Sequence, residues 1–431
     1  MSSAKKSSST LYQDGSVAAS KGEPKKSDVR IVDGVITEVA PGLSPSEGEE
    51  VIDVSGKIIV PGMFDVHVHG REPGREDKET IETCAASAVN GGITGIVLMP
   101  NTTPAIDSGG MVQAVLDIAA KTSPIPVLTS GCITKGRLGE ELAGISGMKA
   151  KGVAFLTDDG DPVPDPMVLR RAMEYADGYG LFTASHAETR ELSAGGAMHE
   201  GEASYRLGIP GIPAASEECC LARDILLAAE TRTHVHIQHV TTRLGMELIR
   251  RFKEEGVKVT CEVTPHHLIF CDDDILDYDT SYKMNPPLRT AKDREGLLQG
   301  LLDGVFDVIA TDHAPHTAFE KNQDFVSAPF GITGLDMAVG CLFHHFIKPG
   351  IFGWDLLVER YADEPRKLID IEPARVAEGA PADFFVFDPG ATTTFTADFM
   401  ESKSSNTPFL DKELDGRIDR VVLGKKVLLD R

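Results

Sequence analysis

The sequence predicts an α/β fold, a (β/α)8 TIM-type barrel with a small β-domain built from both chain ends. Between residues 61 and 374, apolar strand-like runs alternate with amphipathic segments of helix length, which is the order of parallel strands joined by crossover helices. Both ends of the chain instead hold β-branched runs around short turns. A length of 431 residues with 41% hydrophobic content suits one large domain and one smaller domain.

Neither chain end contains enough strands for a sheet of its own. Residues 1–27 are rich in Ser, Lys and Gly without apolar periodicity, so they predict a mobile tail. Residues 28–60 and 375–431 predict the β-domain, and a hairpin signal at Asp33-Gly34 opens it. The strand-like runs are Val29–Val39, Glu50–Val60, Ala382–Asp388 and Arg417–Leu429. Because a lone two-stranded hairpin is marginally stable, we expect these runs to combine into one domain.

Residues 61–374 predict the barrel, with eight strand candidates that are each followed by a helical segment. The expected strands are Met63–His69, Gly95–Met99, Pro126–Thr129, Gly152–Thr157, Leu181–Ser185, His234–His239, Val257–Val263 and Val308–Thr311. The expected helices are Glu79–Asn90, Met111–Lys121, Leu138–Lys151, Pro166–Gly180, Ser216–Thr231, Leu244–Glu255, Ala291–Asp303 and Leu335–Ile347. A doubly wound sheet would show the same alternation, but no glycine-rich phosphate-binding sequence follows the first strand, which favours the barrel.

Composition excludes several classes of partner. A net charge of -23 and a pI near 5.0 argue against nucleic acid and against anionic membrane surfaces. The apolar runs are far shorter than the ~20 residues that span a bilayer, and no secretory signal opens the sequence, so we expect a cytoplasmic protein. Seven scattered cysteines without CxxC spacing indicate neither a disulfide framework nor a cysteine zinc site. A catalytic cysteine would need a lowered thiol pKa, and no neighbouring residue in the sequence indicates one.

The first barrel strand carries His67 and His69, separated by one residue. Side chains on a strand alternate, so both imidazoles share one face and could point at one metal ion. Taken alone this pattern is weak, because two histidines on a half-buried strand are more often packing or surface residues than ligands.

Polar residues also gather at the ends of other strands, where barrel enzymes place their chemistry. They are His67 and His69 on strand 1, Asp158 and Asp159 on strand 4, His186 on strand 5, His239 on strand 6 and Asp312 on strand 8. Imidazole and carboxylate are the ligands of zinc-like metals, and six such ligands, counting the aspartate pair of strand 4 once, are too many for one tetrahedral ion. Each residue alone has a structural explanation, such as a turn or a helix cap, but together they predict two metals that share a bridging carboxylate.

A second group of side chains at the strand ends suggests substrate recognition. It consists of Arg71, Asn101, Asn285 and His316. A permanently charged Arg with amide and imidazole donors is a means for an acidic protein to hold a small carboxylate. The alternative for Arg71 is a surface ion pair with Glu72 or Asp77.

Ten short motifs occur in order along the chain. They are DVHVHGREPG, LMPNTTPAID, FLTDDG, HEGEASYRLGIPGIP, HIQHVTT, CEVTPHHL, KMNPPLR, ATDHAPHT, APFGITGLD and SSNTPF. Taken together, these motifs resemble those of the bacterial-type (class I) dihydroorotases of the amidohydrolase superfamily, over roughly residues 50 to 430.

The resemblance implies roles for particular residues. His67, His69 and Asp312 would bind one zinc, His186 and His239 the second, and Asp159 would bridge them, because the bridging aspartate of the family precedes a glycine, as Asp159 precedes Gly160. Arg71, Asn101 and His316 would hold a carboxylate, while Asn285 and the backbone at Phe330 and Gly331 would contact the substrate ring. Thr317–Pro329 matches the mobile active-site loop of the family. The implied reaction is the reversible cyclisation of N-carbamoyl-L-aspartate to L-dihydroorotate in pyrimidine synthesis, with a metal-bridging hydroxide as nucleophile and Asp312 as general acid/base.

Two departures and several alternatives accompany this resemblance. Gly70 stands where the family usually has a larger apolar residue, which would loosen the position of Arg71. Strand 4 lacks the carboxylated lysine of other amidohydrolases, since Lys149 and Lys151 lie outside it.

The alternatives are a hydantoinase or allantoinase, and a non-catalytic scaffold. The resemblance also implies a homo-oligomer and an association with aspartate transcarbamoylase.

Overall fold

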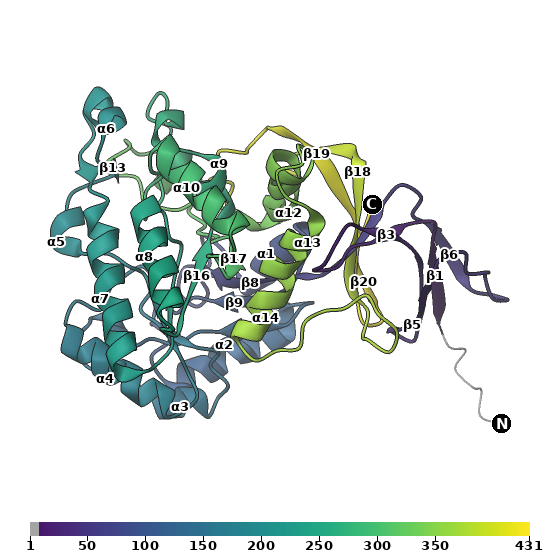
Figure 1. Ribbon diagram of the computed structural model, residues 1–431, viewed down its shortest axis with the longest axis horizontal. Helices are drawn as coiled ribbons and strands as arrows, with labels where there is room; N and C mark the ends of the chain where they lie inside the picture. The colour runs from purple at the N-terminus through teal and green to yellow at the C-terminus, as the bar shows by residue number, and fades with distance from the viewer. Residues whose placement is uncertain (1–7) are drawn as a thin grey trace.

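Eight parallel strands close into a barrel in the computed structural model, which describes residues 8–431 (Figure 1). Their order around the barrel follows the chain, and bridges Gly131–Leu156 and Val68–His313 join the two arcs of strands into a ring. The predicted fold class is therefore confirmed. The barrel strands are β8 (Met63–Val68), β9 (Ile93–Leu98), β10 (Val127–Thr129), β11 (Leu156–Thr157), β12 (Thr183–Ser185), β15 (Val235–Ile237), β16 (Val259–Val263) and β17 (Val308–Ile309).

Helices cover the outside of the barrel between successive strands (Figure 1). Five of them begin at a Ser, Thr or Asp whose side chain accepts a backbone N–H of the first turn, a cap worth about 1 kcal/mol. The crossover helices are α1 (Ile81–Asn90), α2 (Gly109–Thr122), α3 (Ile145–Lys149), α4 (Pro166–Asp177), α7 (Ala215–Thr231), α8 (Arg243–Glu254) and α10 (Ala291–Leu302), and α12 (Ala338–Leu342) lies within a continuous helical segment over 335–347.

One helix is shorter than predicted. The expected helix Leu138–Lys151 reduces to α3, because Gly139 adopts φ +74°, outside the helical region, and Leu142 pairs with Thr134 in a β-bridge. The sequence analysis also missed short elements inserted between the main ones. They are α5 (Arg190–Ser193), β13 (Met198–His199), α6 (Glu202–Leu207), β14 (Gly211–Ile212), α9 (Pro265–Ile269), α11 (Ala318–Lys321), α13 (Trp354–Val358) and α14 (Glu364–Leu368).

Strands from both chain ends lie side by side at one flank of the barrel (Figure 1). One sheet has the order β5-β4-β1-β6 and a second has the order β20-β19-β18-β7-β2-β3. The hairpin at Asp33-Gly34 forms as predicted, with both residues at positive φ. The strands are β1 (Ser9–Gln13), β2 (Ser16–Val17), β3 (Lys25–Lys26), β4 (Asp28–Val32), β5 (Val35–Ala40), β6 (Glu50–Asp53), β7 (Ile58–Pro61), β18 (Asp383–Thr394), β19 (Glu413–Leu423) and β20 (Lys426–Asp430).

The predicted mobile tail over residues 1–27 is wrong for residues 8–27. Strand β1 pairs with β4 on one side and with β6 on the other, and its Leu11 and Tyr12 are buried. The pairing partners lie 17 to 40 residues further along the chain, so local composition does not reveal them. Residues 1–7, which belong to the same prediction, lie outside the described residues.

Asp65 fixes the strands that carry the first and last site residues. Its buried carboxylate accepts the backbone N–H of His67 at 3.0 Å, the backbone N–H of Thr311 at 3.0 Å and the hydroxyl of Tyr361 at 2.7 Å. Burial raises the pKa of Asp65 to about 6. These bonds hold the end of β8 against the end of β17, where Asp312 follows.

Within residues 8–431, no helix has the length and hydropathy to cross a membrane.

Candidate metal centre and substrate cavity

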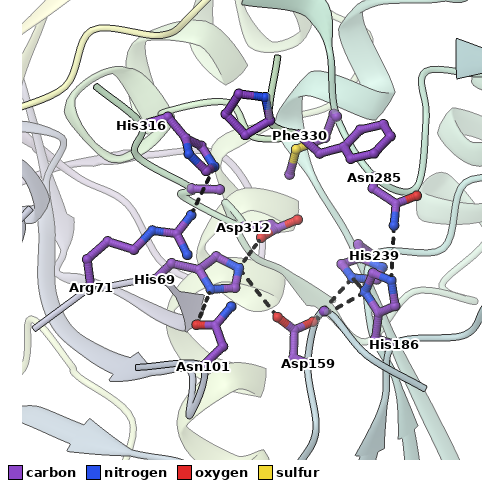
Figure 2. A pocket seen from close by; sticks show the side chains of 14 residues that line it. His69, Arg71, Asn101, Asp159, His186, His239, Asn285, Asp312, His316 and Phe330 are labelled. Atoms are coloured by element: carbon purple, nitrogen blue, oxygen red, sulfur yellow. Dashed lines mark hydrogen bonds and ion pairs between the residues drawn. The ribbon is translucent and has the colours of Figure 1, made fainter. Parts of the chain in front are cut away.

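A cavity of about 330 Å³ opens at the carboxyl ends of the barrel strands (Figure 2). Most of the predicted site residues line it. They are His69, Arg71, Asn101, Asp159, His186, His239, Asn285, Asp312, His316 and Phe330. His67 lies below the cavity floor and is completely buried, and Gly331 is not a lining residue.

The carboxylate of Asp159 lies among four imidazoles. Oδ1 of Asp159 is 3.4 Å from Nε2 of His67 and 3.5 Å from both Nδ1 of His186 and Nε2 of His239. Oδ2 points the other way, 3.4 Å from Nε2 of His69. Each oxygen thus faces a different part of the histidine cluster, which is the arrangement of a carboxylate shared by two ions.

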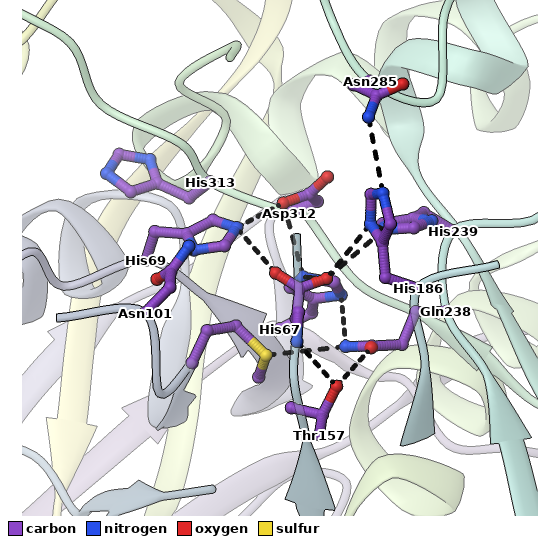
Figure 3. A network of polar contacts seen from close by, with 12 residues as sticks. His67, His69, Asn101, Thr157, His186, Gln238, His239, Asn285, Asp312 and His313 are labelled. Carbon is purple, nitrogen blue, oxygen red and sulfur yellow. Dashed lines mark hydrogen bonds and ion pairs between the residues drawn. The ribbon is translucent and has the colours of Figure 1, made fainter. Parts of the chain in front are cut away.

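Asp312 completes the side of the cluster formed by β8. Its Oδ1 is 2.9 Å from Nε2 of His69 and 3.4 Å from Nε2 of His67 (Figure 3). The ligand atoms of His67, His69 and Asp312 lie within 4.8 Å of one another, and so do those of His67, Asp159 and His239. The structure therefore brings all six predicted ligands together.

The buried charges of this cluster fit metal cations. Burial alone would lower the pKa of His67, but the carboxylates of Glu262, Asp159 and Asp312 together raise it well above the ordinary value. Nε2 of His67 and Oδ1 of Asp159 are buried and have no hydrogen-bond partner in residues 8–431. Unsatisfied buried ligand atoms are costly, and a divalent cation between them would satisfy both.

Asp158, the neighbour of Asp159, faces away from the cluster. One of its carboxylate oxygens accepts the backbone N–H groups of Ile133 and Thr134 at 2.8 and 3.1 Å, and the other accepts the Thr134 hydroxyl. Asp158 therefore orders the loop after β10, while Asp159 points into the cavity. Lys149 and Lys151 are exposed and belong to a different part of the surface.

Three site residues have strained backbones. Arg71, His239 and Asp312 adopt φ values of +58°, +31° and +48°. Such conformations cost about 1–3 kcal/mol for residues other than glycine, and they persist where the surrounding structure holds them. In this chain the three residues follow β8, β15 and β17, and the turn of the backbone aims each side chain at the cavity.

Sequence reasoning missed Glu262, a buried carboxylate on β16. One oxygen accepts Nδ1–H of His67 and, at 3.1 Å, the backbone N–H of His239, and the other lies 3.1 Å from Nε2 of His236. Glu262 thus orients the ring of His67 and the backbone at His239, which follows β15. The available signal was a single acidic residue inside a strand whose other residues are uncharged.

Gln238 and Thr157 extend this support below the cavity (Figure 3). The Thr157 hydroxyl donates to Oε1 of Gln238 at 2.8 Å and accepts the backbone N–H of Asp159 at 3.1 Å. Hydrogen-bonded partners of this kind fix the orientation of ligands and are part of a metal site.

We expect Glu262→Gln to weaken metal binding about 10–100-fold, because His67 loses the charged acceptor that fixes its ring. Competition with a chromophoric chelator would measure the affinity. Asp336→Asn is a matched control, since Asp336 is also buried and hydrogen-bonded but contacts Ser87 and Asn90. Equal metal affinity in Glu262→Gln and in wild type would contradict the assigned role.

Hydrogen-bond donors converge on the opposite wall of the cavity. Nδ1 of His69 lies 2.9 Å from Oδ1 of Asn101. If Nε2 of His69 ligates a metal ion, Nδ1 carries the proton and donates to this oxygen. This bond turns the amide NH₂ of Asn101 away from His69. Arg71 donates from Nε to the carbonyl of Pro315 at 3.1 Å, and its Nη2 lies 3.4 Å from Nε2 of His316. Burial lowers the pKa of Arg71 to about 10, which still leaves it charged at neutral pH.

Of the three residues predicted to contact the substrate ring, Asn285 and Phe330 face the cavity and Gly331 does not. Asn285 and Phe330 line the cavity, and Nδ2 of Asn285 lies 3.4 Å from Nε2 of His186. The backbone of Gly331 is engaged internally, since its N–H donates to Lys283 and its carbonyl accepts from Lys321 and Asn406. A Cβ on Gly70 would lie 2.9 Å from Leu98, so the Leu98 side chain fills the space beside this glycine. Arg71 is nevertheless anchored by Pro315.

The parallel barrel and the histidine–aspartate cluster at its carboxyl face are typical of metal-dependent hydrolases of the amidohydrolase type. Solved structures agree on the fold. The L-hydantoinase of Arthrobacter aurescens matches with a TM-score of 0.86 and 23% identity, over 98% of this chain and 96% of its own. A dihydropyrimidinase from Brevibacillus agri matches with a TM-score of 0.84 and 19% identity, over 98% and 95%.

Sequence comparison gives the family. Residues 56–244 match the family model described as dihydro-orotase-like. The dihydroorotase of Pelotomaculum thermopropionicum is 43% identical over 408 residues, covering 95% of each chain. That of Halalkalibacterium halodurans is 41% identical over 419 residues, covering 97% of this chain and 98% of its own. The chain belongs to the dihydroorotase family.

Proposed function

We propose that this chain is a class I dihydroorotase with two zinc ions, which interconverts N-carbamoyl-L-aspartate and L-dihydroorotate in pyrimidine synthesis. The carboxylate of Asp159 among four imidazole nitrogens, at 3.4–3.5 Å, carries this proposal. The donors on the facing wall of the same cavity support it, because dihydroorotate presents a carboxylate beside the ring amide that reacts.

The six ligands divide into two groups. His67, His69 and Asp312 would hold one ion, His186 and His239 the other, and Asp159 would bridge them. Zinc fits imidazole and carboxylate ligands on the open face of a cavity. When bound, such ions lower the pKa of water and polarise a carbonyl oxygen.

Asp312 is the proposed general acid/base. Its carboxylate lines the cavity, and its pKa is lowered by the neighbouring imidazoles against the effect of burial, so it is ionised and able to accept a proton. In the hydrolytic direction Asp312 takes the proton of the attacking water and delivers it to the ring nitrogen as the C–N bond breaks. In the cyclisation direction it removes the proton of the carbamoyl nitrogen and delivers it to the hydroxyl group that leaves the carbonyl carbon as water.

Three side chains would bind the substrate carboxylate. Arg71 supplies the charge, and Asn101 and His316 supply further donors from the same wall. Asn285 and Phe330, on the other side, would contact the ring.

Metal analysis tests the centre directly. We expect about two zinc ions per chain. Chelation should abolish the hydrolysis of dihydroorotate and added zinc should restore it. Full activity in metal-free protein would contradict the proposal, and metal without dihydroorotate turnover would redirect it to another cyclic amide. A protein with neither bound metal nor dihydroorotate turnover would be a non-catalytic scaffold.

We expect Arg71→Met to reduce kcat/KM for dihydroorotate about 10–100-fold, because a charge-assisted contact to the carboxylate is lost. The metal content should not change. A neutral hydantoin, which lacks the carboxylate, serves as the control substrate, and its turnover should be equal in both proteins. A parallel loss for both substrates would show that Arg71 does not recognise the carboxylate.

A cytoplasmic location, a homo-oligomeric state and an association with aspartate transcarbamoylase stay predictions. Size-exclusion chromatography coupled to light scattering, with and without an added transcarbamoylase, would test the last two.

A further inference from the structure

Lys78 lies behind the carboxylate-binding wall, on the loop that connects β8 to α1. Its side chain is 8% exposed. Nζ of Lys78 is 2.9 Å from Nδ1 of His316 and 2.9 Å from Oε1 of Glu320 on α11. Lys78 therefore stands between an imidazole that lines the cavity and a carboxylate outside it.

The contact with Lys78 decides which nitrogen of His316 carries a proton. An ammonium group has donors and no acceptor, so Nδ1 of His316 must accept the hydrogen bond. A neutral imidazole has one accepting nitrogen, and the proton therefore sits on Nε2. Nη2 of Arg71, 3.4 Å from Nε2, is also a donor without an acceptor and competes with Lys78 for the one accepting nitrogen, but the contact of Lys78 is shorter, at 2.9 Å. With Nδ1 engaged by Lys78, the N–H groups of both His316 and Arg71 are available as donors to a carboxylate in the cavity.

The surroundings would favour the opposite tautomer without Lys78. Oε2 of Glu320 lies 3.7 Å from Nδ1 of His316 and would accept a proton placed there. Nε2 would then accept a hydrogen bond from Arg71. The substrate would then lose the N–H donor of His316. One N–H group of Arg71 would also be unavailable to it, because that group would donate to His316.

We propose that Lys78 is a positioning residue, which holds His316 as an Nε2–H donor toward the substrate carboxylate by occupying Nδ1 and by keeping Glu320 away from it. The inference rests on the proposed function, in which His316 contacts the substrate. It assigns no chemical step to Lys78.

The expected change on removal of Lys78 is in tautomer rather than in charge. Burial, Arg71, Lys78 and Lys321 lower the pKa of His316 to about 2, and Glu320 opposes them. After loss of Lys78, burial and the charges of Arg71 and Lys321 still disfavour the imidazolium. The ring therefore stays neutral at pH 7 and is free to move its proton to Nδ1.

The test is Lys78→Met in the metal-loaded enzyme. Long-range ¹⁵N–¹H correlation of ring-labelled histidines, with His316 assigned by its absence in His316→Asn, should show the proton on Nε2 in wild type and on Nδ1 in the variant. We expect KM for dihydroorotate to rise about tenfold or more while kcat changes little, since a donor to a charged group is lost. Metal content reports whether the fold is intact.

Two further variants separate positioning from a structural effect. Lys78→Arg keeps a donor-only cation and should restore the Nε2 proton and most of the KM. Arg75→Met is the matched control, because Arg75 contacts the same Glu320 at 2.9 Å but not His316, and it should keep wild-type KM. An unchanged tautomer in Lys78→Met, or an equal rise of KM in Arg75→Met, would overturn the inference.

Failure of the proposed function would be visible separately. If His316→Asn leaves KM unchanged, His316 does not contact the substrate, and the kinetic part of the inference falls with that assignment. The ring correlation in Lys78→Met still decides whether Lys78 sets the tautomer.

Discussion

Asp312→Asn is expected to lower the turnover of dihydroorotate about 10²–10⁴-fold, the usual contribution of a general acid/base. Asparagine keeps an oxygen 2.9 Å from Nε2 of His69, so most of the metal should stay bound, but an amide cannot accept the proton of the attacking water. Steady-state rates in both directions, measured beside elemental analysis of the same samples, would separate lost chemistry from lost metal.

The control for Asp312→Asn is again Asp336→Asn, which neutralises a buried carboxylate whose partners are Ser87 and Asn90. Its turnover should equal that of wild type. Near-wild-type rates in Asp312→Asn would remove this residue from the proton path, and complete loss of metal would show that it acts as a ligand only.

Asp159→Asn should abolish measurable turnover and leave no more than one tightly bound metal per chain. The carboxylate faces both His69, through Oδ2, and the pair His186 and His239, through Oδ1. Without its charge, the His186 side of the centre retains imidazoles alone, which bind a divalent ion more weakly than a site with a carboxylate. Elemental analysis after gel filtration would give the stoichiometry.

Asp158→Asn is a matched control one residue away. Asp158 is equally buried, but it bonds Ile133 and Thr134. We expect full metal content and turnover, with the free energy of unfolding reduced by about 1–3 kcal/mol, because an amide oxygen is a weaker acceptor for these groups. Loss of metal in Asp158→Asn, with retention in Asp159→Asn, would exchange the two assignments.

Local sequence predicted the barrel and its ligands because the relevant signals are local. Strand β8 is a short apolar run, and period-2 alternation puts His67 and His69 on one face. The parallel order of the strands then brings residues that end β11, β12, β15 and β17 to the same rim. Five strand ends with metal-binding side chains were therefore enough to predict that the ligands meet.

Signals that depend on pairing with distant segments were missed or misread. Strand β1 contains few apolar residues and is stabilised by β4 and β6, so its composition resembles that of a tail. Glu262 reads as one acidic residue in a strand until His67 is placed against it. Lys78 gives no sign in the sequence that it contacts His316, 238 residues away.

The sequence by itself determined the fold class, the candidate metal ligands at five strand ends and the residues available to bind a carboxylate, because periodicity and strand ends are properties of short segments. The choice of Asp159 from the aspartate pair came from the resemblance to the family. Only the tertiary structure decided where these groups point. The opposite directions of the Asp158 and Asp159 carboxylates, the amide orientation of Asn101 and the tautomer proposed for His316 each depend on hydrogen bonds between distant segments. A hydrogen bond requires a partner at about 3 Å and in a suitable direction, and only the packed chain sets both.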